Sequence, residues 1–199
     1  MWYVIQTVTG KEEELLTFIR TMVQKSLYET CFLFRAEWMK RLGGQWQLQV
    51  QSLFPGYVFI ETKNPEQVFL ELRQIPKFSR LLGSDKSEFI PVREQEERFL
   101  RILAGAEQTG TGKSGTERSG AVSLDREPWE AIVRLTLVQT TEDGDIAAMR
   151  GALSYFKKEI VRVNLHKRYA VVRTRILGEE RTLKFGIRIE NADDSLEVF

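Results

Sequence analysis

The sequence predicts an α+β domain with an antiparallel sheet, followed by a small β-barrel, and three observations lead to this prediction. Residues 1–104 alternate between β-rich runs and stretches with helical spacing of apolar residues. Residues 105–127 begin with a glycine-rich polar stretch, the composition of a flexible linker. Residues 128–199 contain short β-rich runs separated by glycine or polar turns, as in small barrels. We therefore expect two domains, 1–104 and 128–199, joined by a linker.

The first domain opens with a strand and a helix. Residues 2–9 are aromatic and β-branched, which favours a strand. The next residues predict an amphipathic helix, because apolar side chains recur at helical spacing at Leu15, Phe18, Ile19, Met22 and Val23.

A hairpin follows, formed by residues 30–42 and 45–54 around a Gly-Gly turn. In its second strand the apolar residues Trp46, Leu48 and Val50 alternate with glutamines. This alternation predicts a strand with one buried face.

The rest of the first domain is expected to contain a strand at 57–61 and two helices. Residues 64–75 offer an Asn cap with Pro at the first helical position, and residues 89–106 read as a second Pro-led helix. Residues 127–139 fit a short helix or a strand equally well. Beyond them, strands are expected at 145–149, 159–165, 169–176 and 181–189.

The segment "LFPGYVF" places Pro55 and Gly56 inside a run that otherwise reads as a strand. Proline donates no ladder hydrogen bond and glycine permits a bulge, so the pair is expected to bend the sheet just before residue 57. Phe54 and Tyr57 are then either core residues or members of an exposed apolar patch. The residues alone leave both interpretations open.

The composition excludes several classes of protein. The 199 residues are 42% hydrophobic and 29% charged, as in ordinary globular proteins. One cysteine and one histidine give neither an internal disulfide nor a zinc spacing, so we expect no metal and no cofactor. No run approaches the roughly 18 apolar residues of a membrane helix, so we expect a cytoplasmic protein without membrane contact.

Positive charge is concentrated near the C-terminus. Residues 151–190 contain 10 Lys and Arg against 4 Asp and Glu, with tyrosine and phenylalanine interleaved. Such a segment favours phosphate contacts and base stacking, with a solvated barrel face as the alternative. No recognition helix is visible, so RNA is favoured over duplex DNA. The candidate RNA-binding residues are Lys157, Lys158, Arg162, His166, Lys167, Arg168, Arg173 and Arg175.

An ordered set of segments resembles the N-terminal (NGN) domain of the NusG family of transcription elongation factors. The set comprises "WYVIQT", a glycine-led acidic helix, "GGQ", "LFPGYVF", "RQIPKFSRLLG" and "PVREQEERFL". After the linker, "GDIAAMRGALSYFKKEIVRVNLHKRYAVVRT" resembles the KOW module of these proteins, a small SH3-like barrel. Ala152 stands where the family usually has proline, and Ile160 replaces a near-diagnostic glycine. This drift is most similar to the LoaP-type antiterminator, a specialised paralogue.

The resemblance implies that the first domain binds the clamp region of RNA polymerase through an apolar patch. By position, the patch would be supplied or supported by Trp2, Tyr3, Phe54, Pro55, Gly56 and Tyr57. It also implies proximity to single-stranded non-template DNA, with Arg73, Gln74, Lys77 and Arg80 as candidate contacts.

The function expected from the resemblance is non-enzymatic. The chain would act as a monomeric processive antitermination factor in the bacterial cytoplasm, bound to polymerase by its first domain and to a nascent RNA element by its second. The alternative is an adaptor whose KOW module binds a ribosomal protein or a termination factor.

Two apparent catalytic signals and one thiol have simpler interpretations. "GTGKSGT" imitates a phosphate loop, but Glu107 occupies the position where the pattern needs its first glycine. His166 has no neighbouring nucleophile motif, so a surface or RNA-facing role is expected. Cys31 is expected to be a small buried apolar residue.

Overall fold

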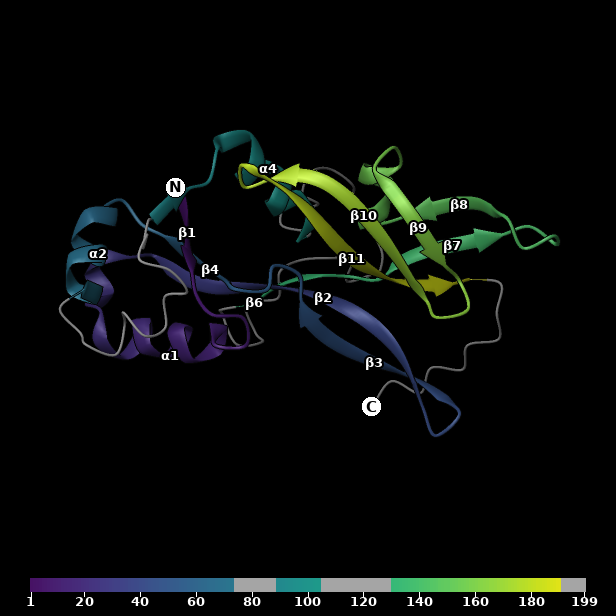
Figure 1. Ribbon diagram of the computed structural model, residues 1–199, viewed down its shortest axis with the longest axis horizontal. Helices are drawn as coiled ribbons and strands as arrows, with labels where there is room; N and C mark the ends of the chain where they lie inside the picture. The colour runs from purple at the N-terminus through teal and green to yellow at the C-terminus, as the bar shows by residue number, and fades with distance from the viewer. Residues whose placement is uncertain (74–88, 105–129, 191–199) are drawn as a thin grey trace, which may run out of the picture. The chain divides into compact units, whose positions relative to one another are not determined.

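The computed structural model describes residues 1–73, 89–104 and 130–190. The predicted linker and three of the candidate DNA contacts, Gln74, Lys77 and Arg80, lie outside these ranges. The chain forms two compact units, the first mainly of residues 1–34 and 54–102 and the second mainly of 35–53 and 132–199 (Figure 1). Each unit is described separately below.

The first unit is built on antiparallel strands covered by helices. In chain order its elements are β1 (Trp2–Gln6), α1 (Glu12–Met22), the 3₁₀ helix η1 (Lys25–Leu27), the start of β2 (Thr30–Leu42), β4 (Tyr57–Glu61), α2 (Pro65–Arg73), β5 (Phe89–Pro91) and α4 (Glu94–Leu103). Strand β4 pairs antiparallel with β1 and β2, and β1 pairs antiparallel with β5. This is the predicted α+β arrangement.

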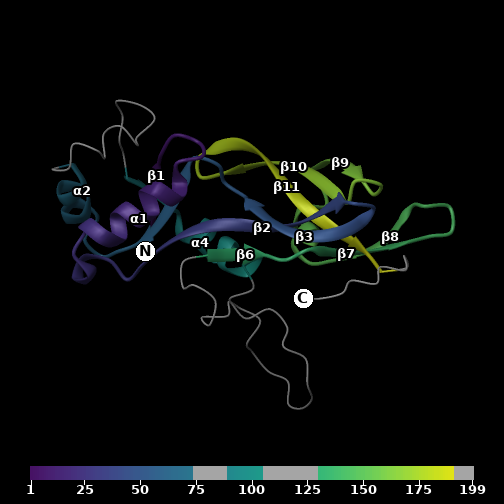
Figure 2. The ribbon, with the colours of Figure 1, turned by 90° about the horizontal axis from the view of Figure 1, so that it is seen from below.

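Alternation along the strands gives the sheet two chemically different faces. One face belongs to an aliphatic core with α1 and α2, formed by Ile5, Leu15, Leu16, Ile19, Val23, Cys31, Leu33, Val58, Ile60, Val68 and Leu72. Strand residues of the opposite parity, including Phe32 and Phe59, form an aromatic cluster on the other face. Figure 1 shows α1 and α4 on opposite sides of β4, and Figure 2 shows the same elements from below.

The two helices expected after residue 62 are present with different boundaries. Helix α2 begins at Pro65, and the Asn64 carbonyl accepts a hydrogen bond from the Val68 N–H, so its predicted start is confirmed. The expected helix from residue 89 was wrong over its first residues. Residues 89–91 form β5, because they add an antiparallel strand to the edge of β1, and α4 starts only at Glu94.

Pro55 and Gly56 do bend the chain before β4, as predicted. The Tyr57 N–H donates to the Phe54 carbonyl at 3.2 Å, and Gly56 has φ 82°, the pattern of a tight turn with proline second and glycine third. A β-carbon at residue 56 would lie 3.0 Å from the Thr7 carbonyl oxygen. The turn therefore requires glycine.

The turn is fastened to the start of α1 by a buried carboxylate. Glu12 accepts hydrogen bonds from the Gly56 N–H at 2.6 Å and the Gly10 N–H at 2.8 Å. The carboxylate thus satisfies the Gly56 N–H, a backbone donor that burial would otherwise leave unpaired.

The second unit combines a hairpin with a five-stranded sheet, here called the C-terminal sheet. The hairpin joins the end of β2 to β3 (Gln45–Ser52) through the predicted Gly43-Gly44 turn. The C-terminal sheet has the order β8-β7-β11-β10-β9, with β7 Thr136–Thr140, β8 Ile146–Arg150, β9 Ile160–Asn164, β10 Tyr169–Ile176 and β11 Glu179–Ile189. A 3₁₀ helix, η2 (Ala152–Phe156), lies between β8 and β9. The predicted small β-barrel class is confirmed.

Residues 127–139, which fitted a helix or a strand equally well in sequence, contain strands in their described part. β6 (Glu130–Val133) pairs with β2, and β7 follows directly. The predicted buried face of β3 was wrong at Leu48 and Val50, which are 51% and 40% exposed. β3 is an edge strand, and alternation alone cannot tell whether another element covers a face. Within the described ranges, no helix is long and apolar enough to cross a membrane.

Candidate functional surfaces

The aromatic cluster of the first unit consists of Trp2, Phe32, Phe34, Phe54 and Phe59. The Trp2 ring meets Phe32 edge-on at 4.9 Å, and Phe34 meets Phe59 at 5.0 Å and Phe54 at 5.7 Å between centroids. These are the offset and edge-to-face distances that aromatic rings prefer. All five side chains are buried.

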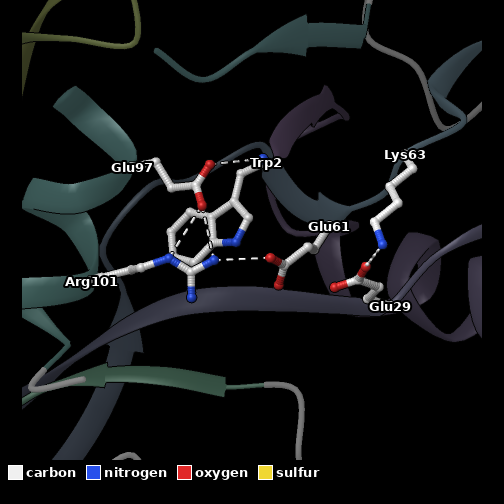
Figure 3. A network of polar contacts seen from close by, with 6 residues as sticks. All are labelled: Trp2, Glu29, Glu61, Lys63, Glu97 and Arg101. Atoms are coloured by element: carbon white, nitrogen blue, oxygen red, sulfur yellow. Dashed lines mark hydrogen bonds and ion pairs between the residues drawn. The ribbon is translucent and has the colours of Figure 1, made fainter. Parts of the chain in front are cut away.

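An ionic cap from α4 covers the Trp2 ring (Figure 3). The Arg101 guanidinium lies 4.3 Å from the ring centroid, and it donates to Glu97 at 2.8 Å and to Glu61 at 2.9 Å. Glu97 also accepts a hydrogen bond from the Trp2 backbone N–H at 3.0 Å. Burial lowers the pKa of Arg101, but its hydrogen bonds to Glu97 and the charges of Glu61 and Glu97 outweigh this, so its pKa is raised and it stays protonated.

The structure separates the residues expected to form a polymerase-binding patch. Trp2 and Phe54 are only 4% and 1% exposed, and Tyr57 and Gly56 are also buried. Pro55 is exposed and Tyr3 is half-buried. Of the two open interpretations for Phe54 and Tyr57, the core interpretation describes where they lie. Of the six residues expected in the patch, only Pro55 and part of Tyr3 can touch a partner without rearrangement.

The candidate RNA-binding residues are mostly exposed. Seven of the eight lie on the surface of the second unit, namely Lys157, Lys158, Arg162, His166, Lys167, Arg173 and Arg175. As predicted, Arg173 and Arg175 alternate with buried residues of β10 and share its exposed face. Arg168 differs: it is buried, has φ 57°, and places its guanidinium 5.1 Å from the Trp46 ring centroid. Its side chain therefore packs within the unit.

Of the candidate DNA contacts, only Arg73 lies in the described part of the chain. It is exposed at the end of α2, with its guanidinium 5.5 Å from the Phe69 ring centroid. The assignment of this residue to DNA stays a prediction.

The structure accommodates both residues that depart from the expected KOW pattern, Ala152 and Ile160. Ile160 enters β9 opposite Val172, next to a shift in the strand register. The turn at Glu159 is held by backbone hydrogen bonds to Phe156 and from Arg173. Ala152 is buried at the start of η2.

Within the second unit, the hairpin packs against the C-terminal sheet, a contact that no local sequence pattern indicates. The buried Glu37 carboxylate accepts hydrogen bonds from Arg134 at 2.5 Å and from the Leu135 N–H at 2.9 Å. The Trp38 ring stacks on Tyr169 with centroids 5.5 Å apart and planes at 16°.

At this contact the backbones of the hairpin and β11 approach so closely that only glycine fits between them. A β-carbon at Gly186 would overlap the Glu37 carbonyl oxygen and the Leu135 side chain. The absence of a side chain at one position of β11 thus allows the hairpin to approach.

The described residues include no cluster of metal ligands and no exposed thiol. Among the described residues, no group of His, Cys, Asp and Glu could hold a metal ion. Cys31 is buried as predicted, and burial raises its pKa to about 12, so the thiol stays protonated at neutral pH.

Comparison with known proteins identifies relatives of the N-terminal half of the chain. A protein-family model described as "Transcription termination factor nusG" matches residues 1–101, about half of the chain. The chain belongs to the NusG family. Two similar relatives are named "Transcription termination/antitermination protein NusG". The one from Buchnera aphidicola is 28% identical over 103 residues (50% of this chain and 57% of the relative), and the one from Treponema pallidum is 29% identical over 92 residues (42% and 50%).

The chain spans about half the length of the curated relatives it matches. A solved structure described as "Domain interaction in Thermotoga maritima NusG" is similar over 94% of this chain and 93% of that chain, with a TM-score of 0.45 and 19% identity. The membership in the NusG family therefore rests on the match to residues 1–101.

Proposed function

We propose that this chain is a processive antitermination factor of the LoaP type. Its first unit binds the clamp region of RNA polymerase, and its second unit contacts nascent RNA. The proposed activity makes and breaks no covalent bond. Membership in the NusG family supports the part of the proposal that concerns transcription.

The observation that carries the RNA part is the exposed positive surface of the C-terminal sheet. Seven of the eight basic candidates there lie on the surface, and Arg173 and Arg175 project from one face of β10. Within the described ranges, Arg173 approaches one carboxylate, that of Glu180, at 3.8 Å, a separation at which an exposed pair contributes little. Both guanidiniums are thus available to phosphates.

The polymerase part of the proposal gives the aromatic residues a supporting role. Trp2, Phe54 and Tyr57 fix the shape of the sheet and of the 54–57 turn, while exposed Pro55 and half-buried Tyr3 make contact. An aromatic or proline anchor on a rigid support loses little entropy on binding. Arg73 at the end of α2 is proposed to lie near the non-template strand, with Gln74, Lys77 and Arg80 following it in sequence.

In vitro transcription through an intrinsic terminator tests this function. Templates that differ only in the leader are transcribed with and without the full chain. We expect read-through that depends on the leader and falls at least fivefold when Arg173 and Arg175 are both changed to Gln. Read-through on every leader alike would instead indicate a general factor, and none on any leader would refute the proposal.

A further inference from the structure

A cleft in the second unit lies where the β2–β3 hairpin meets the turn between β9 and β10. Its volume is about 290 Å³, and two indoles and a phenol line it, those of Trp38, Trp46 and Tyr169. This is near the lower end of the range for small-molecule sites, roughly 300 Å³, with room for about one nucleotide. A duplex cannot enter a space of this size.

The rim of the cleft is cationic. Two lysines, Lys40 and Lys167, line it beside His166, and none of its lining residues is acidic. Within the described part of the chain, no carboxylate pairs with the side chains of these three residues. Aromatic rings beside unpaired cations are the combination that binds a base together with its phosphate.

The two indoles are held in place before any ligand arrives. Tyr169 stacks on Trp38, and the buried Arg168 guanidinium lies over Trp46. Each ring therefore loses little freedom when another flat group is added, which favours binding. This also gives Arg168 a positioning role, although its sequence context suggested direct contact with RNA.

We propose that this cleft binds one unpaired nucleotide of a single RNA strand, with its base against Trp38 and Trp46 and its phosphate beside Lys40 and Lys167. The inference rests on the proposed contact with RNA, and it adds the site and the kind of nucleotide bound. It also assigns a role to the hairpin that the C-terminal basic residues alone do not provide.

Binding of fluorescein-labelled rU12 to the full chain tests the cleft. Trp46→Ala should weaken binding about tenfold, the lower range for loss of one stacked base, and Trp46→Phe should recover most of it. In the Lys40→Gln/Lys167→Gln variant, the slope of log K against log salt should fall by about 0.7, the contribution of the one phosphate that both lysines contact on a single strand.

The matched control is Lys25→Gln/Lys63→Gln, which removes the same charge from exposed lysines of the first unit that do not line the cleft. It should leave the affinity within about twofold of the native chain. Circular dichroism confirms that each variant is folded. If the cleft variants bind rU12 as the control does, or if the native chain does not bind it, the cleft is not a nucleotide site.

Two further measurements separate the possible failures. Annealing rU12 to rA12 should abolish binding at the cleft, and undiminished binding of the duplex would overturn the proposal. dT12 in place of rU12 tells whether the cleft prefers RNA; tighter binding of dT12 would contradict the assignment to RNA. Failure of rU12 binding concerns the cleft alone, because leader-dependent read-through tests the proposed function by a different readout.

Discussion

Both aromatic groups of the molecule contain tryptophan, but their rings end in opposite states. In the first unit, Trp2 is buried against three phenylalanines and covered by Arg101. In the second unit, Trp38 and Trp46 are half-buried and line a cleft. The two states differ in how many faces of each ring are in contact with other parts of the protein. A ring that is packed and capped stabilises the fold, whereas a ring held on one side keeps a surface for a ligand.

The comparison is tested most strongly by removing one ring from each group. Phe59→Ala leaves a cavity at a fully buried position and should lower the free energy of unfolding by about 3–5 kcal/mol. Trp46→Ala removes a half-exposed ring and should cost about 1 kcal/mol. Urea titrations followed by circular dichroism measure both. Equal losses would mean that the cleft aromatics are also structural.

The ionic cap predicts a smaller change in stability, which two substitutions in α4 can test. Arg101→Gln removes the cation over Trp2 and its two carboxylate contacts, and should cost about 1–2 kcal/mol. It should also increase acrylamide quenching of Trp2 fluorescence in a background where the other tryptophans are phenylalanine. Arg98→Gln on the same helix breaks only an exposed pair with Glu94 and should cost under about 0.5 kcal/mol. A similar effect of the two changes would remove any special role for the cap.

The smallest expected effect on stability concerns Cys31, which lies in the aliphatic core of the first unit. The Cys31 pKa is raised from 9.0 to about 12 by burial, so between these values the unfolded thiol ionises while the folded thiol keeps its proton. The folded state then binds more protons, and stability falls as pH rises through this window. From pH 7 to pH 10 the native chain should lose about 1 kcal/mol more unfolding free energy than Cys31→Ala, given about 1.4 kcal/mol per pKa unit. Parallel pH dependences would show that water reaches the thiol.

Local patterns predicted most of the fold. Helical spacing located α1, an Asn-Pro pair located α2, and Gly43-Gly44 located the hairpin turn. These features depend on neighbours in sequence, where turn and cap chemistry decide the conformation. β5 was missed because three residues acquire strand structure only from pairing with β1.

The candidate surfaces were less predictable, because burial depends on residues far apart in sequence. Arg101 covers Trp2 from 99 positions further along the chain, and Glu37 binds Arg134. Neither partner is indicated by a motif. Leu48 and Val50 show the same limit, since alternation reveals two faces of a strand and not which of them is covered.

The buried bond from Gly56 to Glu12 also has a consequence for folding kinetics. The two residues are 44 positions apart, so the bond forms only after the intervening segment has closed on itself. An interaction between such distant positions that is completed after the transition state slows unfolding and leaves the folding rate unchanged. We therefore expect loss of the Glu12 carboxylate to raise the unfolding rate of the first unit more than it lowers the folding rate.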